Sequence, residues 1–449
     1  MQPQDLTWRI IDRPDETFKI HRSLYTDQQI FDLEMEHIWE SNWIYIGHDS
    51  QLPKPFDYIT THIGRQPVII ARDGEGRLGG FINACSHRGA QVCRKARGNA
   101  KTWTCPYHGW VYDTQGRVLD VKAEAQGAYP AGWDKGDYGL TPVPRVESYH
   151  GFIFASLRAD VQDLKTHLAA AAPFLEMFAN QSEQGLEVLR GASTYTHRGN
   201  WKIQAENGVD GYHADTVHAS YFRLAQVRAQ EAAKAGRQDD VKAISVAGQD
   251  LRSGNYDLGN GHVIIWTDIP NFRDRALGMQ YDALVERVGE LQARWMAARL
   301  RQVLIYPNVI LFDGISTQLR SWRPIATDET EVHAVCVAPR GEPAEARERR
   351  VRQYEDFYGA SGIATPDDLT EFDACQTGYH GRLAQWQDFD RGMARRIVGA
   401  DDVAQELGLD PAVSAGDFAD ETLYHGEYRQ WLKLMLEGIE RKKDRKHAA

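Results

Sequence analysis

Cys85-Ser86-His87 is followed, 17 residues later, by Cys105-Pro106-Tyr107-His108, so two short segments of the chain each carry one cysteine and one histidine. Each segment is predicted to be a turn between two β-strands. Two thiolates and two imidazoles from such a pair of turns can bind one metal centre. Gly89 and Gly109 follow the two turns, where a residue without a side chain lets backbone N–H groups approach that centre.

The identity of the metal follows from how the four side chains are divided between the turns. Zinc also accepts two cysteines and two histidines, but zinc modules more often take each pair as two cysteines or two histidines, at wider spacing. One cysteine and one histidine per turn is typical of a Rieske [2Fe–2S] cluster, in which one iron binds both thiolates and the other both imidazoles. The pattern therefore predicts that Cys85, His87, Cys105 and His108 bind a [2Fe–2S] cluster, and that Cys93 does not.

Residues 43–157, which surround these turns, are predicted to form a small antiparallel β domain. Apolar residues alternate in short runs such as residues 58–63, and turn signals such as Asp73-Gly74-Glu75-Gly76 separate the runs. Residues 1–42 are expected to be an N-terminal helical segment that packs on the catalytic domain. The capping pattern Thr26-Asp27-Gln28-Gln29 is predicted to start one of its helices.

Residues 158–449 are predicted to form a larger catalytic domain, so the fold class is α+β, with an antiparallel sheet flanked by helices. A long helix is expected over residues 281–301, where apolar residues repeat at spacings of four and three. Residues 229–261 are rich in glycine and show no sustained period, which predicts a mobile loop, or a lid over a pocket. The β-rich runs that follow the long helix are 303–306, 309–312, 318–322 and 332–337.

The composition limits the class of protein. The chain has 449 residues, 63 of them acidic and 52 basic, and the net charge of −11 disfavours nucleic acid as a partner. No stretch approaches the roughly 18 consecutive apolar residues of a spanning helix, so no membrane is expected. The opening Met1-Gln2-Pro3-Gln4-Asp5 lacks the basic and apolar regions of a signal peptide, and we expect a cytoplasmic protein.

A second metal site is suggested by His213 and His218, which lie five residues apart. In a regular helix this spacing places two side chains about 140° apart around the axis, so both imidazoles reach one ion only if the helix ends or bends between them. Gly208 and Gly211 make such an irregularity plausible. Taken alone, two histidines at this spacing are weak evidence and indicate ordinary surface or core residues.

The predicted cluster changes this interpretation, because an electron-transfer centre needs an acceptor for its electrons. Two histidines and one carboxylate are the ligand set of a non-haem Fe(II) that keeps positions open for dioxygen. The spacing does not select the carboxylate. Asp210 has a further candidate role, since on a helical turn it shares a face with His213 and could orient that imidazole. The candidates for the carboxylate ligand are Glu206, Asp210, Asp215 and the pair Asp367-Asp368.

Further motifs spread over nearly the whole chain carry a resemblance to a known family. The chain resembles the large (α) subunit of the Rieske non-haem iron aromatic-ring-hydroxylating dioxygenases, in the benzoate, toluate and anthranilate branch. The motifs are Ile63-Gly64-Arg65-Gln66-Pro67, Asn83-Ala84-Cys85-Ser86-His87-Arg88-Gly89-Ala90, Leu186-Glu187-Val188-Leu189-Arg190-Gly191, Ala205-Glu206-Asn207-Gly208, Tyr306-Pro307-Asn308 and Arg352-Gln353-Tyr354-Glu355-Asp356-Phe357.

The resemblance implies one [2Fe–2S] Rieske cluster and one mononuclear Fe(II) per chain. It implies that His213, His218 and Asp368 bind the iron, and that Asp210 bridges His213 to the cluster ligand His108 of a neighbouring subunit. It also implies a head-to-tail trimer that pairs with small β subunits as α3β3. The expected electron donor is a flavin and iron–sulfur reductase that oxidises NADH.

The implied reaction is the cis-dihydroxylation of an aromatic carboxylate, benzoate or a substituted benzoate, by O₂. Alternatives are an anthranilate or 2-halobenzoate 1,2-dioxygenase, and a Rieske monooxygenase or demethylase on a related acid. A different class is an electron carrier or a zinc-stabilised binding protein, which leaves the second site unexplained. Relatives commonly carry Trp-Asn-Tyr where this chain has Ala219-Ser220-Tyr221, and the exchange of Trp for Ala enlarges whatever space that side chain occupies, which would admit a bulkier or ortho-substituted carboxylate. By residue type, Arg223, Arg228 and Arg320 are candidates to bind the carboxylate.

Overall fold

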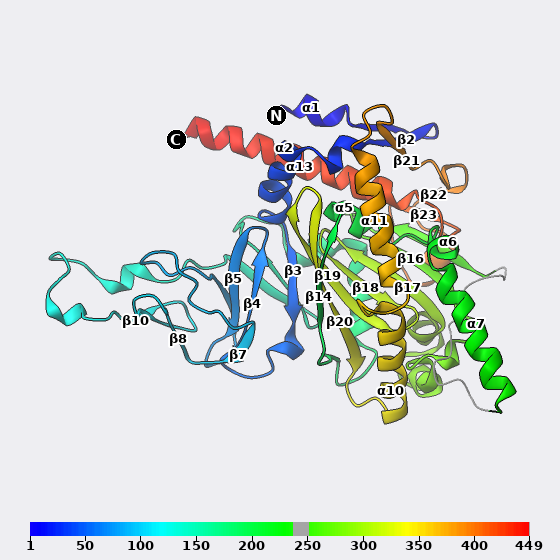
Figure 1. Cartoon of the computed structure of the whole chain (residues 1–449), viewed down its shortest axis with the longest axis horizontal. Helices are drawn as coiled ribbons and strands as arrows, with labels where there is room; N and C mark the ends of the chain where they lie inside the picture. Colours follow the sequence, from blue (N-terminus) through cyan, green and yellow to red (C-terminus); the bar gives the residue numbers. More distant parts are fainter. Residues whose placement is uncertain (237–250, 449) are drawn as a thin grey trace. The chain divides into compact units, whose positions relative to one another are not determined.

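The computed structural model of the protein describes residues 1–236 and 251–448. The chain divides into two compact units, one formed by residues 35–164 and the other by residues 1–34 and 165–449. Figure 1 shows the strands and helices of both. In the part of the chain that is described, no helix combines the length and the apolar character needed to cross a membrane.

The smaller unit is built from short antiparallel strands, as the alternation of apolar residues predicts. Three small sheets have the strand orders β11-β12-β3, β6-β5-β4-β7 and β10-β9-β8. Their apolar side chains enclose a core that includes Cys85, Cys105 and Trp110. The strands are β3 (Ile44–His48), β4 (Asp57–Ile63), β5 (Gln66–Arg72), β6 (Leu78–Ile82), β7 (Arg97–Asn99), β8 (Thr102–Thr104), β9 (Val111–Asp113), β10 (Val118–Asp120), β11 (Arg145–Tyr149) and β12 (Phe152–Ser156).

The larger unit contains a ten-stranded sheet with the path β13-β20-β19-β18-β17-β16-β15-β23-β22, and β14 pairs with β20 beside that path. Its strand pairs are antiparallel, and helices pack beside it, which confirms the predicted α+β class. The strands are β13 (Leu186–Val188), β14 (Ser193–Arg198), β15 (Ser253–Asp257), β16 (Val263–Asp268), β17 (Arg299–Ile305), β18 (Val309–Asp313), β19 (Thr317–Ala326), β20 (Glu329–Pro339), β22 (Ile397–Val398) and β23 (Val413–Ala415).

Several helices lie beside the ten-stranded sheet of the larger unit. α11 packs against β14, and α13 packs against β15 and β16. α5, α6 and α7 follow one another along the chain beside the sheet. Their bounds are α5 (Trp201–Asn207), α6 (Ala214–Val217), α7 (Ala219–Lys234), α10 (Ala344–Gln353), α11 (Thr365–Tyr379) and α13 (Leu423–Ala448).

The N-terminal segment of the larger unit contains more than helices. After α1 (Pro3–Thr7), the hairpin of β1 (Ile10–Arg13) and β2 (Thr17–His21) pairs with β21 (Trp386–Asp388). α2 (Gln28–Glu34) follows, and Asp27 rather than Thr26 caps it, because Asp27 Oδ1 accepts a hydrogen bond from the backbone N–H of Gln29 at 2.9 Å.

The expected long helix over residues 281–301 is wrong. α8 (Tyr281–Val288) ends at Gly289, whose φ of 82° belongs to the left-handed region that a helix cannot continue through. α9 (Glu290–Ala293) and a π-helical turn follow, and β17 begins at Arg299.

The predicted loop over residues 229–261 is wrong at both ends. α7 extends to Lys234, and β15 pairs with β16 from Ser253 onward. Residues 237–250, on which the mobile loop or lid was also expected, lie outside the described residues.

A buried ion pair joins α2 to α5 in the larger unit. Lys202 Nζ lies 2.6 Å from Glu34 Oε1, and the side chains of both residues are almost completely buried. The indole N–H groups of Trp201 and Trp431 also donate to Glu34, at 2.8 and 2.7 Å. Glu34 therefore accepts three hydrogen bonds inside the core.

Replacing Lys202 by methionine is expected to lower the free energy of unfolding by about 3–5 kcal/mol, because Glu34 then becomes a buried charge without its cation. Urea denaturation followed by tryptophan fluorescence measures the change. Lys433→Met, on the exposed face of α13, is the matched control and should cost under about 0.5 kcal/mol. If both variants lost the same free energy of unfolding, the buried pair would contribute no more to stability than an exposed lysine.

Candidate metal centres

The first candidate centre lies on two turns of the smaller unit with the same backbone design. In one turn the N–H of Gly89 donates to the carbonyl of Cys85 at 2.7 Å, and in the other Gly109 donates to Cys105 at 3.0 Å. Both glycines have positive φ, 74° and 78°, which explains why glycine occupies each position. The two turns therefore present their cysteine and histidine side chains in the same way.

The four predicted ligands divide into a buried pair and an outer pair. Cys85 and Cys105 are 4% and 2% exposed and form no disulfide, whereas His87 is exposed and His108 is half-buried. The two imidazole rings lie 4.5 Å apart between centroids. This arrangement fits a Rieske cluster, since the thiolate iron would sit inside and the histidine iron near the surface, where electrons enter and leave.

The surroundings of this centre favour the same group. The indole of Trp110 stacks on His87, with centroids 5.1 Å apart and planes 3° apart. The hydroxyl of Tyr112 lies 3.1 Å from Cys85 Sγ, where it can donate to a ligand sulfur. Desolvation and the neighbouring His87 lower the pKa of His108, which favours the neutral imidazole that binds a metal. The thiol of Cys93 instead points to the carbonyl of Lys95, 3.7 Å away.

The second candidate centre lies where the chain leaves α5. The expected irregularity is present, because α5 ends at Asn207, and His218 sits between α6 and α7 outside regular helical geometry. The two glycines are required here by close packing. A Cβ on Gly208 would lie 1.8 Å from Ile310, and one on Gly211 would lie 2.4 Å from Phe418.

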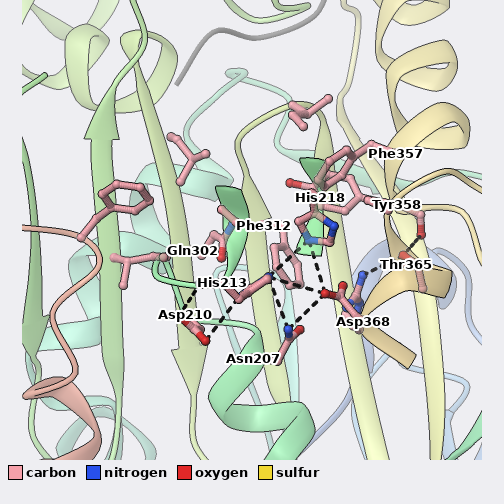
Figure 2. Close-up of a pocket in the computed structure, with 18 of the residues that line it drawn as sticks. Asn207, Asp210, His213, His218, Gln302, Phe312, Phe357, Tyr358, Thr365 and Asp368 are labelled. Carbon is pink, nitrogen blue, oxygen red and sulfur yellow. Dashed lines mark hydrogen bonds and ion pairs between the residues drawn. The ribbon is translucent and has the colours of Figure 1, made fainter. Parts of the chain in front are cut away.

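His213, His218 and Asp368 meet at this centre. Their donor atoms lie within 4.8 Å of one another, and the two Nε2 atoms are 3.2 Å apart. Asp368 Oδ1 lies 3.5 Å from Nε2 of His213 and 3.3 Å from Nε2 of His218. Figure 2 shows the three side chains pointing toward one another from α11 and from both ends of α6. Two imidazoles and one carboxylate in this arrangement are the donor set that suits a non-haem Fe(II).

The other carboxylates that the spacing left open point elsewhere. Glu206 is half-buried, and the hydroxyl of Tyr25 donates to it at 2.6 Å. Asp215 is exposed on α6. Asp367 accepts a hydrogen bond from Ser220 at 3.0 Å. Neither Glu206, Asp215 nor Asp367 is part of the cluster of donor atoms.

Asp210 lies behind His213, as its expected orienting role requires. Asp210 Oδ2 is 3.3 Å from Nδ1 of His213, on the side of the ring that faces away from Asp368. Burial lowers the pKa of His213, but the carboxylates of Asp210 and Asp368 outweigh this effect and raise it above its ordinary value. Burial lowers the pKa of His218 despite the nearby Asp368. The two imidazoles therefore differ in basicity, because Asp210 lies 3.3 Å from Nδ1 of His213, whereas the carboxylates near His218 do not outweigh its burial.

One residue of this centre was missed by the sequence reasoning. Asn207 Nδ2 donates to Asp368 Oδ1 at 3.2 Å and lies 3.5 Å from Nε2 of His213. It fixes the carboxylate oxygen that faces the histidines. A glycine directly after Asn207 is the feature of the sequence that could have pointed to it. Asn207 is the last residue of α5, and because the helix stops at Gly208 its amide can turn toward the site.

The three donors line a pocket of about 730 Å³, open solvent at its mouth included. Figure 2 shows the pocket beside β17, β18 and α11. Most of its walls are apolar and wide enough for an aromatic ring, which is the usual character of a small-molecule site. The apolar wall residues are Phe222, Ile265, Leu300, Phe312, Ile315, Phe357 and Phe418, and the polar groups apart from the metal-site side chains include Gln302, Arg320 and Thr365.

The structure separates the three candidate arginines. Arg223 is exposed on α7, and Arg228 is paired with Asp356 at 2.8 Å. Arg320 alone of the three lines the pocket, where it is 3% exposed. Ala219 is exposed at the start of α7 and does not line the pocket, so the space that the smaller side chain leaves is not part of the pocket.

Comparisons with known proteins agree with both centres. Residues 42–149 match the family model of the Rieske [2Fe–2S] domain, and residues 186–437 match that of the ring hydroxylating alpha subunit (catalytic domain). Toluate 1,2-dioxygenase subunit alpha of Pseudomonas putida is 44% identical over 97% of this chain and 94% of its own length.

Two further relatives have nearly the same similarity. The 2-halobenzoate 1,2-dioxygenase large subunit of Burkholderia cepacia is 42% identical over 94% of this chain and 90% of its own. The anthranilate 1,2-dioxygenase large subunit of Acinetobacter baylyi is 42% identical over 96% and 93%. Among solved structures, a naphthalene 1,2-dioxygenase variant bound to phenanthrene superposes with a TM-score of 0.83, at 24% identity, over 97% of this chain and 95% of that one, which shows the shared fold.

Proposed function

The chain belongs to the alpha subunits of the Rieske-type aromatic-ring-hydroxylating dioxygenases, and from this premise we propose that it cis-dihydroxylates an aromatic carboxylate such as benzoate. The protein is thus an oxidoreductase with one Rieske [2Fe–2S] cluster and one mononuclear iron. The observation that carries the proposed substrate class is the ring-sized apolar pocket, which ends on His213, His218 and Asp368 and contains a buried guanidinium.

In this proposal the two sets of side chains have separate tasks. Cys85, His87, Cys105 and His108 hold the cluster that passes on single electrons, while His213, His218 and Asp368 hold the iron. An Fe(II) held by two histidines and one carboxylate keeps positions open for O₂ and supplies the oxygen chemistry. The apolar walls exclude water and hold the aromatic ring beside that site. Asn207 and Asp210 keep the carboxylate and the imidazole in place.

Substrate choice within the benzoate type is the finer part of the proposal. Toluate, 2-halobenzoate and anthranilate, which name the three relatives, are all benzoates with one additional substituent. The 42% and 44% identities do not separate these alternatives. Benzoate or a substituted benzoate is therefore the proposed substrate, with O₂ as the second reactant.

The proposed partners follow from the names of the relatives, which are alpha or large subunits of multicomponent enzymes. We propose a small β subunit in an α3β3 assembly, and a flavin and iron–sulfur reductase that takes electrons from NADH. We also propose that Asp210 links His213 to His108 of a neighbouring copy. The side chain of Asp210 is 27% exposed and next to the exposed Tyr212, and His108 is half-buried, so both groups are accessible in their own units.

Asp210→Ala is expected to slow electron arrival at the iron by about 10–100-fold without emptying either metal site. The measurement is stopped-flow reoxidation of the reduced cluster on mixing with O₂ and benzoate, with iron content assayed in the same samples. Asp215→Ala is the matched control, because this aspartate is also near His213 in sequence but is exposed on α6 and, among the described residues, forms no ion pair with that imidazole. An unchanged reoxidation rate in the Asp210 variant would remove its proposed linking role.

The test of the proposed reaction is oxygen uptake by the purified oxygenase, supplied with a reductase and NADH, on a panel of benzoates under ¹⁸O₂. We expect uptake that depends on the aromatic acid, and a cis-diol that carries both labelled atoms. A product with one labelled atom would instead identify a monooxygenase or demethylase. The absence of uptake with every aromatic acid of the panel would contradict the proposed function.

A further inference from the structure

We propose that Arg320 binds the carboxylate group of the substrate and so determines which ring carbons face the iron site. This inference rests on the proposed function as an aromatic-acid dioxygenase. Arg320 lies on β19, is 3% exposed, and lines the same pocket as the three metal-site side chains. It is the one pocket-lining arginine in the described part of the chain.

The buried charge of Arg320 is not balanced by the protein. Among the described residues no carboxylate oxygen lies within 4.0 Å of its guanidinium. The other buried arginines do have such partners. The pairs are Arg275 with Asp313, Arg299 with Asp268, Arg301 with Asp313, and Arg350 with Glu342. An unbalanced buried cation is costly, so a protein retains one where an anion from outside completes the pair.

Neutral groups hold the Arg320 guanidinium in one orientation. Its Nε donates to Gln318 Oε1 at 3.0 Å, and one terminal nitrogen lies 3.4 Å from Thr365 Oγ1. The carbon at its centre is 4.8 Å from the ring centroid of Phe312, a wall residue of the pocket. The planar fork is therefore fixed before a substrate arrives, which reduces the entropy lost on binding a carboxylate.

The position of Thr365 relates this guanidinium to the iron site. Thr365 and Asp368 are three residues apart in the first turn of α11, which corresponds to a rise of about 4.5 Å along the helix. Arg320 therefore contacts the same helical turn that carries the metal-site carboxylate. A ring attached to a carboxylate on Arg320 would lie in the pocket whose walls include Phe312 and Phe357.

The charges of the pocket favour a monoanion. Asp368 and Asp210 are the two carboxylates that line the pocket, and a divalent iron would offset both. Arg320 then leaves the pocket with one net positive charge. A benzoate in this pocket pairs with the guanidinium in bidentate geometry, whereas a neutral arene leaves the guanidinium without its anion. Arg320 therefore selects for aromatic acids.

A purely structural role is the competing explanation, because Arg320 also ties β19 to α11 through Thr365. The two roles differ in what the loss of the guanidinium does to different ligands. A structural residue affects acids and neutral isosteres alike, since it shapes the whole pocket. A carboxylate-binding residue affects the acid alone.

The experiment compares binding of benzoate and of its neutral isostere benzamide by isothermal titration, to the purified iron-loaded oxygenase with its partner subunits. In Arg320→Gln the Kd for benzoate should rise about 100-fold, and the Kd for benzamide should change less than about 3-fold. Arg320→Lys keeps the charge but loses the fork, so it should give an intermediate loss for benzoate. Arg223→Gln removes an equal charge from the exposed face of α7 and should change neither Kd.

Iron content, the visible spectrum of the cluster and the thermal unfolding midpoint are measured on the same samples and should match the wild type. The inference is overturned if Arg320→Gln binds benzoate within about 3-fold of the wild type, or if it loses benzamide as strongly as benzoate. If Arg320→Gln does not fold, Arg320→Lys decides by the same comparison of the two ligands. Failure of the proposed function looks different, because the wild type itself then neither binds nor oxidises benzoate, toluate or anthranilate.

Discussion

Replacing Asp368 by alanine is expected to abolish turnover while the visible spectrum of the [2Fe–2S] cluster persists. The substitution removes the carboxylate of the three donors and leaves His213 and His218, too few ligands to retain the iron. Turnover should fall at least about 1,000-fold, since metal-ion catalysis supplies several kcal/mol of transition-state stabilisation. Iron analysis, absorption spectroscopy and NADH-coupled oxygen uptake on the same preparation measure all three quantities.

Asp367→Ala is a matched control for this variant. Asp367 is the adjacent residue of α11, but it pairs with Ser220 and lies outside the cluster of donor atoms. It should retain iron and most of the activity. Loss of iron in Asp367→Ala but not in Asp368→Ala would reverse the assignment within the pair, and loss of cluster colour in Asp368→Ala alone would contradict the division into two independent centres.

Replacing Cys105 by alanine should reduce turnover as strongly as Asp368→Ala, because Cys105 is a predicted ligand of the cluster that donates the electrons. The variant loses one of two buried thiolates, so the cluster fails to assemble and the visible absorption disappears. Turnover driven by NADH stops, at least about 1,000-fold below the wild type, because the iron receives no electrons. The mononuclear iron is retained, since its three donors lie in the other unit.

Cys93→Ala is the control for Cys105→Ala. Cys93 is buried in the same hydrophobic core of the smaller unit, but its thiol faces the carbonyl of Lys95. The control variant should keep full colour and activity. A colourless Cys93→Ala, or a Cys105→Ala variant that keeps its colour, would contradict the assignment of the cluster ligands.

The fold could be predicted where local patterns are sufficient. The β-rich residues 58–63 form β4 over Asp57–Ile63 as predicted, although buried and partly buried residues do not strictly alternate along the strand. The helix expected over residues 281–301 failed because Gly289 adopts a positive φ. An apolar repeat that continues through a glycine does not reveal that conformation.

The candidate site could be predicted only where its residues are near in sequence. Cys85 and His87 lie on one turn, so their chemistry is visible in the spacing. His213 and His218 flank α6, and their spacing indicated a metal site only together with the predicted cluster. Asp368 comes from α11, far along the chain, and no spacing relates it to the histidines. The resemblance to the family implied Asp368 as the ligand, and the structure places it beside the two histidines.

The residues that line the pocket could not be predicted from local sequence patterns, because the tertiary fold brings them together. Arg320 faces it because β19 pairs with β18 in the register that places Arg320 opposite Ile310. Ala219 looked important because the relatives differ there, but the start of α7 places it in solvent. Residue type alone could not separate Arg320 from Arg223 and Arg228, since only burial and ion pairing distinguish them.

The proposed function requires two separate iron centres in each chain, one that relays electrons and one that activates oxygen. Quantifying iron and acid-labile sulfide per chain, for the wild type and Asp368→Ala side by side, tests this most directly. We expect three irons and two sulfides for the wild type, and two of each for the variant. Zinc in place of iron, or a variant that keeps the third iron, would contradict it.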